Sequence, residues 1–532
     1  MSAVSRTVAY LRYAWALRSF LGGTVTPERG REVIRVRLQN RERDFLSLMK
    51  RAVYNYPPSP YLPMLQWAGC EYGDLERMVH SEGLEPALRR LCEAGVFLTV
   101  EEFKGKRQVV RGGRSLPFRS DHLNNPLLVS GIQAGSSGSR SAGTVTTLNL
   151  DRTAYHAACN AVSFTAHGMR GRPTLLWNPI LPSAAGLTIL LQLCKLGAPP
   201  ERWFSPVAAR AIRPSLSKRL ATLYVVNAGR LFGSKIPSPE YVSGEQIHVI
   251  AECLRDVLKR GQGCVVSCSP SSAARLSTVA RAAGMNLSGV TFMTSGEPLT
   301  PAKDNEIRST GAGAMNLYAF AEGGVVGLGC AGEKSECDDV HLMEGSLALI
   351  QRRRETSFGG GPVDAFLLTS LFDRTAKVLL NVESGDFGVH EARDCGCELC
   401  AAGLGRHLHS IRSFDKLTGE GMTFVGTDLV RIIEEVLPSR FGGASTDYQM
   451  VETEDAASRT RLDVVVSPEV GIIDEAELVR VVLSELGRSG ETNRMMAEVW
   501  RQGSVLRVKR ERPHLTAGGK LLPLHIMRER TN

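Results

Sequence analysis

The chain has 532 residues, of which 43% are hydrophobic and 22% charged, an ordinary composition for a soluble globular protein. This length is too great for one hydrophobic core and predicts two or three domains. The net charge is +9, but the basic residues are scattered, so no nucleic-acid-binding face is expected. No run approaches the roughly 18 uninterrupted apolar residues of a membrane span.

The first 110 residues are predicted to be mostly helical. Residues 1–23 are amphipathic and lack the apolar core and cleavage site of a secretory signal, so a helix packed on the body is expected. A helix lying on a membrane surface is the alternative. Apolar residues recur at helical spacing in 31–53 and 75–93, and a proline-rich break at 57–60 separates the two runs. We expect a cytoplasmic location.

Residues 135–144 contain only small, hydroxylated or glycyl residues and one arginine. Such a loop presents many backbone N–H groups and hydroxyls to an anion, and Arg140 adds a positive charge. The loop is not a Walker motif. From composition alone, a phosphate-binding loop and a flexible linker are equally consistent with this segment.

Strand-like and helical segments alternate from about residue 120 to 390, which predicts an α/β layered domain. Strands are expected at 174–177, 263–267 and 290–293, and a helix at 272–283. After residue 411 the pattern changes to helices at 428–437 and 474–486 and strands at 462–466 and 504–508. This part is predicted to be a small α+β domain.

Two segments in the α/β region could contact a nucleotide. Ser295, Gly296, Glu297 and Pro298 follow the strand at 290–293, where ligands bind in α/β sheets, although a plain turn has the same sequence. Glu322 stands in an apolar, glycine-rich stretch, where a carboxylate is costly unless it meets a cation. A magnesium ion bound to a nucleotide phosphate would satisfy it. A capping or exposed glutamate is the alternative.

Three further residues complete an ordered set. Asp386 follows a strand and could accept both ribose hydroxyls. Arg412 lies at the junction with the small domain, and Lys520 lies in a glycine-containing stretch near the C-terminus.

In this order, the motifs resemble the adenylate-forming superfamily of acyl-CoA ligases and adenylation domains, and most closely its phenylacetate-CoA ligase branch, over residues 120–532. The resemblance implies a large α/β domain, 120–411, to which the helical residues 1–119 belong, and a small mobile α+β domain, 412–532. It also implies ATP and Mg²⁺ as cofactors and a small carboxylic acid as substrate. The acid would be activated as an acyl-adenylate and passed to a thiol, either coenzyme A or a carrier protein.

The resemblance also implies a role for each residue. The pyrophosphate would be held by Ser136, Ser137, Gly138 and Ser139, and, because of its charge, by Arg140. The adenine would lie against Ser295, Gly296, Glu297, Pro298 and Tyr318, the magnesium on Glu322, and the ribose on Asp386 and Arg412. The hinge would be Asp415, with Lys416 as the alternative, and Lys520 would bridge the substrate carboxylate and the α-phosphate.

The chain departs from the family pattern in three places. Arg140 and Ser141 replace the usual threonine and glycine of the phosphate loop, and Gly143 replaces a basic or polar residue. Ala321 stands where threonine is common, and Glu383 and Ser384 replace an arginine–threonine pair. Adenylation stays plausible with these changes, but the acid and the acceptor are left open.

Five of the twelve cysteines lie within about 70 residues of one another, which favours a metal over disulfides in a reducing compartment. Thiolates and an imidazole suit a closed tetrahedral zinc site. The resemblance favours Cys330, His341, Cys395 and Cys397 as ligands, with Cys337 and Cys400 in reserve. A metal-free group of buried thiols is the alternative.

The sequence therefore predicts an AMP-forming acid–thiol ligase. Three alternatives stay open: an amide ligase, an enzyme that activates another oxyanion such as nitrite for N–N bond formation, and a non-catalytic nucleotide-binding relative. A monomer or a homodimer is expected.

Overall fold

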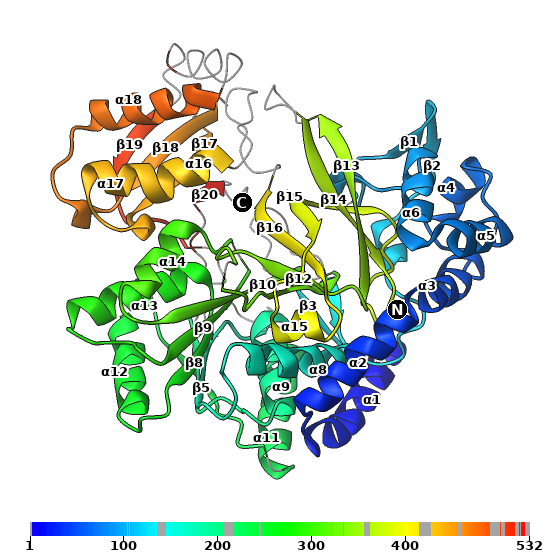
Figure 1. Ribbon diagram of the computed structural model, residues 1–532, viewed down its shortest axis with the longest axis horizontal. Helices are drawn as coiled ribbons and strands as arrows, with labels where there is room; N and C mark the ends of the chain where they lie inside the picture. The colour runs from blue at the N-terminus through cyan, green and yellow to red at the C-terminus, as the bar shows by residue number, and fades with distance from the viewer. Residues whose placement is uncertain are drawn as a thin grey trace.

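The computed structural model describes most of the chain and places it in a twelve-stranded sheet, a four-stranded sheet, two two-stranded sheets and the helices around them (Figure 1). It describes residues 3–103, 105, 107–135, 145–181, 184–206, 216–232, 234–243, 246–296, 298–320, 322–333, 335–355, 362–413, 427–454, 460–489, 501, 506–515, 521 and 523–526. The predicted α/β class is confirmed.

The first part of the chain is helical. Its elements are α1 (Ala3–Leu21), α2 (Pro27–Gln39), α3 (Arg41–Met49), the π-helix η1 (Lys50–Tyr54), α4 (Leu62–Trp67), α5 (Tyr72–Glu82), α6 (Leu84–Glu93), α7 (Val100–Phe103), β1 (Val109–Arg111), β2 (Arg114–Leu116) and the 3₁₀-helix η2 (Ser120–Leu123).

The predicted helices in this part are correct in type and wrong in extent. The helix expected over 31–53 is divided at Asn40, between α2 and α3. The helix expected over 75–93 is divided at Gly83, whose φ of +88° is a backbone conformation that breaks a helix and that glycine adopts without strain. The apolar spacing continues across both breaks, so periodicity alone does not reveal them.

The central part of the chain alternates strands and helices. Its elements are β3 (Ile132–Gly135), β4 (Val145–Leu148), α8 (Leu150–Ala166), β5 (Thr174–Trp177), α9 (Ala184–Lys195), β6 (Arg202–Ser205), α11 (Leu216–Leu231), β7 (Pro239–Tyr241), α12 (Ile247–Leu258), β8 (Cys264–Cys268), α13 (Pro270–Ala282), β9 (Val290–Ser295), α14 (Pro301–Arg308), β10 (Gly313–Phe320), β11 (Gly324–Gly329), β12 (Val340–Leu342), β13 (Leu347–Glu355), β14 (Pro362–Ser370), β15 (Val382–Ala392), α15 (Glu398–Ala401) and β16 (Arg406–Ser413).

Twelve of these strands form one mixed sheet. Their order is β13-β14-β15-β16-β12-β11-β10-β9-β8-β5-β6-β7. From β10 to β7 the pairs are parallel, because helices connect successive strands, and from β13 to β10 they are antiparallel. The strands predicted at 174–177, 263–267 and 290–293 are β5, β8 and β9, all in the parallel half, and the predicted helix at 272–283 is α13.

The N-terminal helices share a core with the antiparallel half of the sheet. Phe45, Leu88 and Leu98 pack in one buried cluster with Phe366 of β14. Leu98 also forms a parallel bridge to β15, because its N–H donates to the carbonyl of Asn381. The helical region therefore packs against the large sheet and shares its core.

The last part of the chain has its own sheet and core. Its elements are α16 (Thr427–Arg431), the π-helix η4 (Ile432–Val436), α17 (Leu437–Phe441), η5 (Ser445–Asp447), β17 (Tyr448–Glu454), β18 (Thr460–Val466), η6 (Pro468–Val470), α18 (Glu475–Leu486), η7 (Gly487–Ser489), β19 (Leu506–Arg510) and β20 (Leu524–Ile526). The strand order is β19-β18-β17-β20, so the strands predicted at 462–466 and 504–508 are neighbours. Residues 504 and 505 of the second lie outside the described part.

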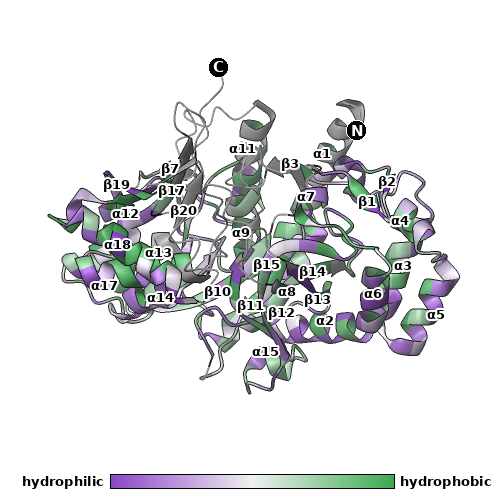
Figure 2. Cartoon of the chain, turned by 90° about the horizontal axis from the view of Figure 1, so that it is seen from above, coloured by the Kyte–Doolittle hydropathy of each residue, from purple (hydrophilic) through white to green (hydrophobic). Residues whose placement is uncertain are grey.

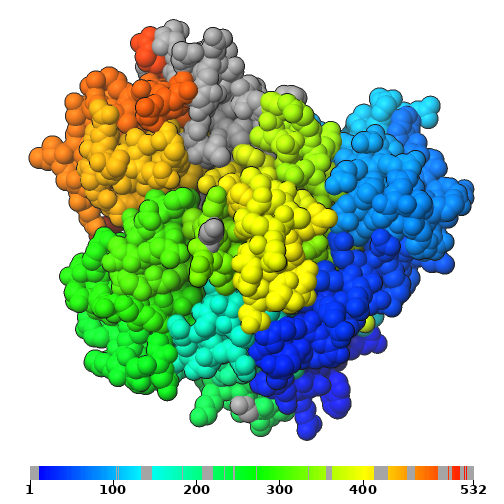
Figure 3. Space-filling model, viewed as in Figure 1, coloured from blue at the N-terminus to red at the C-terminus, as the bar shows by residue number. Residues whose placement is uncertain are grey.

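A buried ion pair joins the small sheet's helices to the large sheet's helices. Lys303 of α14 lies 2.8 Å from Glu434 of η4, and both side chains are buried. The hydroxyl of Thr300, the N-cap of α14, also donates to Glu434. Figure 3 shows the C-terminal part, in orange, seated on the green segment that contains α13 and α14.

Candidate functional site

The carboxyl ends of β9 and β10 bring two predicted nucleotide segments to one edge of the sheet. The strands are parallel, with Leu317 registered to Ser295, so Ser295 and Gly296 lie beside Tyr318. Gly296 has φ +90°, which turns the chain away from β9. Pro298 follows, before Thr300 caps the N-terminus of α14. This edge is the usual ligand position in parallel sheets.

Tyr318 and Asp386 are in direct contact although 68 residues separate them. The Tyr318 hydroxyl donates to Oδ2 of Asp386 over 2.8 Å and lies 3.4 Å from Oγ of Ser384. Burial, and then the charge of Asp386, raise the pKa of Tyr318 well above its usual range, so the phenol stays a donor. The structure thus unites one predicted adenine residue with the predicted ribose residue.

The contact also shows that the antiparallel half of the sheet is curled. Tyr318 is on β10 and Asp386 on β15, and the strand order places four spacings between these strands. Four spacings in a flat sheet cover about 19 Å, and two side chains could not meet across that distance. The curl brings Asp386, which lies within β15, to Tyr318 near the end of β10.

Glu322 lies in the turn between β10 and β11 and is buried. Its electrostatic neighbour is Lys377, also buried, which contacts Oδ1 of Asn124 at 3.0 Å. Burial lowers the pKa of Lys377, and the charge of Glu322 partly opposes this. A magnesium ion bound to Glu322 would therefore lie close to the charge of Lys377. The role of Glu322 as a magnesium ligand stays a prediction.

Arg412 is held by a carboxylate that sequence reasoning did not single out. Its Nη1 donates to Oδ2 of Asp338 over 3.0 Å. The same carboxylate accepts from the backbone N–H groups of Ser410 and Ile411, so Asp338 fixes this end of β16. Arg412 would contact a ribose only beside, or in exchange for, Asp338.

The remaining predicted nucleotide residues lie outside the described part of the chain. These are Ser136, Ser137, Gly138, Ser139, Arg140, Glu297, Asp415 and Lys520. The strands that flank the first group are described: β3 and β4 are antiparallel, with Gly135 registered to Val145. The chain therefore enters and leaves residues 136–144 at adjacent positions.

Arg152, close to the end of β4, is a second residue that sequence reasoning missed. Its Nη1 is buried and has no hydrogen-bond partner among the described residues, while Nη2 contacts the carbonyl of Thr147 at 3.3 Å. Burial lowers its pKa to about 10. A buried guanidinium with an unpaired N–H group could bind an anion, which would supply the missing acceptor. A lone arginine in a helix gives no sequence signal.

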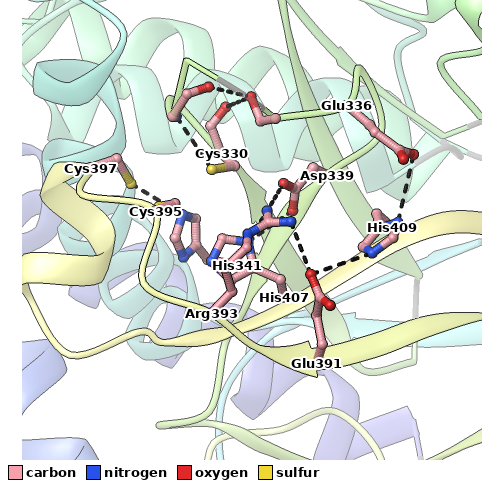
Figure 4. A network of polar contacts seen from close by, with 12 residues as sticks. Cys330, Glu336, Asp339, His341, Glu391, Arg393, Cys395, Cys397, His407 and His409 are labelled. Carbon is pink, nitrogen blue, oxygen red and sulfur yellow. Dashed lines mark hydrogen bonds and ion pairs between the residues drawn. The ribbon is translucent and has the colours of Figure 1, made fainter.

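The four predicted metal ligands lie together, although they come from three places in the chain (Figure 4). Cys330 directly follows β11, His341 is in β12, and Cys395 and Cys397 precede α15. Nε2 of His341 lies 3.1 Å from Sγ of Cys397 and 3.6 Å from Sγ of Cys395. Ligand atoms of Cys330, His341, Cys395 and His407 all lie within 4.8 Å of one another. The described residues thus contain a Cys/His group that could hold a metal.

The hydrogen bonds around this group suit metal binding. Nδ1 of His341 donates to the carbonyl of Leu404 over 2.7 Å, which leaves the lone pair of Nε2 toward the thiols. The backbone N–H of Gly332 donates to Sγ of Cys330. The Cys330 thiol, and then His341, lower the pKa of Cys397 and so favour its thiolate, the form that binds metals.

The geometry separates the reserve cysteines from the group. Sγ of Cys337 contacts the carbonyl of Leu299, and Sγ of Cys400 contacts Oδ1 of Asp394 at 3.3 Å. The turn that allows Cys395 and Cys397 to share one partner is made by Gly396, with φ +71°.

His407 was missed by sequence reasoning and is a rival for the fourth ligand position. It is registered to His341 across β12 and β16, and the ring centroids are 4.1 Å apart. Its Nδ1 lies 2.9 Å from Oδ1 of Asp339, and its buried Nε2 has no partner among the described residues. A carboxylate behind a histidine is a common arrangement next to a bound metal.

Paired substitutions show whether Cys397 or His407 is the fourth ligand beside Cys330, His341 and Cys395. If Cys397 is the fourth ligand, Cys397→Ser should weaken zinc binding by at least about tenfold, whereas His407→Asn should leave it within about threefold. The affinity can be measured by competition with a chromophoric chelator. The opposite ranking would assign the position to His407.

No protein-family model matches the sequence, and a search of curated proteins finds no match. Among solved structures, the chain is similar to a 2-hydroxyisobutyryl-CoA ligase in complex with 2-HIB-AMP and CoA, with 15% identity, a TM-score of 0.48 and coverage of 92% of this chain and 90% of that one. It is also similar to the amide bond synthetase McbA from Marinactinospora thermotolerans, at 13% identity, a TM-score of 0.42 and coverage of 96% and 98%.

A third similar structure is the O-succinylbenzoate coenzyme A synthetase MenE from Bacillus subtilis in complex with ATP and magnesium ion. The identity is 12%, the TM-score 0.43, and the coverage 74% of this chain and 68% of that one.

Proposed function

We propose that the protein activates a carboxylic acid with ATP, as an acyl-adenylate, and releases pyrophosphate. The observation that carries the proposal is the contact between Tyr318 and Asp386 at the carboxyl edge of β9 and β10. Segments that the motif order assigns to one nucleotide meet there, and Ser295 and Gly296 lie on the same edge. A structural role alone gives no reason for these motifs to converge.

In this proposal the adenine lies against Ser295, Gly296, Glu297, Pro298 and Tyr318, and the ribose is held by Asp386 and Arg412. Because its phenol donates to the carboxylate, Tyr318 orients Asp386, whose carboxylate oxygens can also accept from the ribose hydroxyls. The pyrophosphate contacts Ser136, Ser137, Gly138, Ser139 and Arg140. Mg²⁺ bound to the phosphates and Glu322 would offset their negative charge.

The reaction joins two anions, because the substrate carboxylate attacks the α-phosphate. The new bond is carboxyl oxygen to phosphorus, and the bond to the pyrophosphate oxygen breaks. Positioning and cationic stabilisation therefore account for catalysis. Lys520 supplies the cation between the carboxylate and the α-phosphate. It lies on the proposed small domain, 412–532, which turns at Asp415 relative to residues 1–411 and so admits the second nucleophile.

The second nucleophile is a thiol in our proposal, that of coenzyme A or of a carrier protein, and the acid is aryl or of medium length. These choices follow the phenylacetate-CoA ligase branch. Zinc held by Cys330, His341, Cys395 and Cys397 would be structural, because four protein ligands leave no open position.

Pyrophosphate release, screened over acids and nucleophiles, tests the proposal. Acid-dependent release followed by a thioester with coenzyme A is the expected result. Release only with nitrite would support the activation of another oxyanion, and release followed by an amide would support an amide ligase. No release with any substrate, from protein that binds ATP, would support the non-catalytic alternative.

Substitutions of the contacting pair test the site itself. Asp386→Ala should raise the KM for ATP by about 10- to 100-fold, which corresponds to the loss of one charge-assisted hydrogen bond of roughly 1.5–3 kcal/mol. Tyr318→Phe should raise it less, since the carboxylate stays. Asp364→Ala, on β14, is the control and should leave the KM for ATP unchanged. An unchanged KM in Asp386→Ala would contradict the assignment.

A further inference from the structure

Helices α1 and α11 lie side by side and share a core. The Tyr224 hydroxyl donates to the carbonyl of Ala14 over 2.9 Å, and the Arg18 guanidinium lies over the Phe232 ring at 5.8 Å. On their inner sides, Tyr13 and Leu17 of α1 and Val225 and Val226 of α11 pack in one buried cluster. The two helices therefore form one surface, placed at the same end of the molecule in Figure 1.

The outer sides of these helices are apolar. Six of the fourteen large hydrophobic side chains that are exposed in the described part of the chain lie here, and we call them the α1–α11 face: Leu11 (65% exposed), Trp15 (82%), Leu220 (56%), Leu223 (57%), Tyr224 (42%) and Leu231 (77%). On α11 their spacing of three, four and seven residues places them on one side of the helix. Figure 2 shows hydrophobic residues along α11.

The same two stretches of sequence contain no acidic residue. Residues 1–27 have three arginines and neither aspartate nor glutamate, and residues 202–239 have seven lysines and arginines and again no acid. Arg12 and Arg18 lie on the exposed side of α1, next to Leu11 and Trp15. Exposed apolar side chains on α1 and α11 thus lie in two stretches of sequence that contain only basic charges.

We propose that the α1–α11 face binds the surface of an anionic lipid bilayer. Tryptophan and leucine are suited to the boundary between headgroups and acyl chains, and arginines bind the phosphates of the headgroups. Each basic residue near an anionic surface adds to the attraction, and acidic residues that would oppose it are missing from both stretches. None of the described helices is long and apolar enough to cross a membrane, so the helices lie in the interface plane.

Charge favours lipid over a second copy of this chain. Two copies docked through this face would bring their arginines together, and like charges across an interface oppose association. An anionic bilayer carries the opposite charge and supplies an apolar layer for the exposed side chains. The proposal is independent of the adenylation activity, since none of its residues belongs to the candidate nucleotide site.

Sedimentation with vesicles tests the proposal on the full chain. The protein should bind vesicles that contain phosphatidylglycerol at least about tenfold more tightly than vesicles of phosphatidylcholine alone, and salt should weaken the binding. Trp15→Ser combined with Leu223→Ser should lower the affinity at least about tenfold, and so should Arg12→Glu combined with Arg18→Glu. Trp67→Ser is the matched control, because Trp67 is also exposed but lies on α4.

Circular dichroism and the melting temperature show whether each variant is folded. Absence of binding to both kinds of vesicle at low salt would overturn the proposal, as would an equal loss in Trp67→Ser. A dimer of the wild-type chain that Trp15→Ser dissociates, without vesicle binding, would instead assign the face to a second copy. Binding of an acidic protein without vesicle binding would also overturn it.

Discussion

Lys520→Ala is expected to abolish acid-dependent ATP–pyrophosphate exchange, with a loss of at least about 100-fold, while the fold stays intact. The reason is electrostatic, because the attacking carboxylate and the α-phosphate are both anions and the developing charge lies between them. Lys520 is the cation that the motif order places there. Because Lys520 acts on the reacting groups in this proposal, its replacement by alanine should not affect stability.

A control variant and a partial reaction show whether Lys520→Ala affects catalysis or folding. Arg512→Ala removes a positive charge eight residues away, from a side chain that is 65% exposed, and should retain exchange. Lys520→Ala should still transfer the acyl group from a chemically prepared acyl-adenylate to the thiol. Exchange at the wild-type rate in Lys520→Ala would contradict the proposed mechanism.

The contact between the two parts of the chain bears on how Lys520 is delivered. Glu434 is buried against Lys303 and Thr300, which immediately follow the predicted adenine segment. Separating a buried ion pair leaves two unpaired charges and is costly. In our proposal, rotation of the small domain therefore includes the exposure of Lys303 and Glu434 to water, and the position of the domain is linked to the start of α14.

Cys395→Ser is expected to release the metal and to lower the melting temperature by several degrees. Loss of one ligand removes the cross-link that the metal makes between segments of the chain, and destabilisation by a few kcal/mol lowers the melting temperature of a large domain by several degrees. The group connects β11, β12 and the loop before α15, so its loss loosens three neighbouring segments. Elemental analysis and thermal unfolding measure the two effects.

Cys400→Ser is the matched control, since its sulfur contacts Asp394 and the carbonyl of Arg393. It should keep one zinc per chain and the wild-type melting temperature. Carefully prepared wild-type protein without any metal would refute the zinc site. An equal effect of Cys400→Ser and Cys395→Ser would show that the loss is not specific to the group.

The sequence indicated that a Cys/His metal group exists, but it did not settle which cysteines and histidines belong to it. The resemblance selected Cys330, His341, Cys395 and Cys397, which do lie together, whereas the exclusion of Cys337 and Cys400 required coordinates. His407 could not be anticipated, because a histidine within a strand is ordinary and its position depends on the pairing of β12 with β16. Asp338 and Asp339 could not be anticipated either, because their contacts with Arg412 and His407 depend on the same pairing of strands.

Element types were predictable where the local pattern is strong, as for β5, α13 and α18. The breaks at Asn40 and Gly83 were not, because the apolar spacing continues through them while the backbone does not. The contact of Tyr318 with Asp386 depends on the curl of a sheet whose strands are far apart in sequence. Local patterns contain no information about such curvature, so the motif order could place both residues at one site but could not show their contact.

Isotope transfer from the substrate tests adenylation most directly. An acid labelled with ¹⁸O in its carboxylate is incubated with the protein, ATP, Mg²⁺ and the thiol identified by the release screen, and the products are analysed by mass spectrometry. Because the carboxyl oxygen bonds to the α-phosphorus and stays there when the acyl group leaves, AMP should carry one ¹⁸O and pyrophosphate none. Label in inorganic phosphate together with formation of ADP, or unlabelled AMP, would contradict the account.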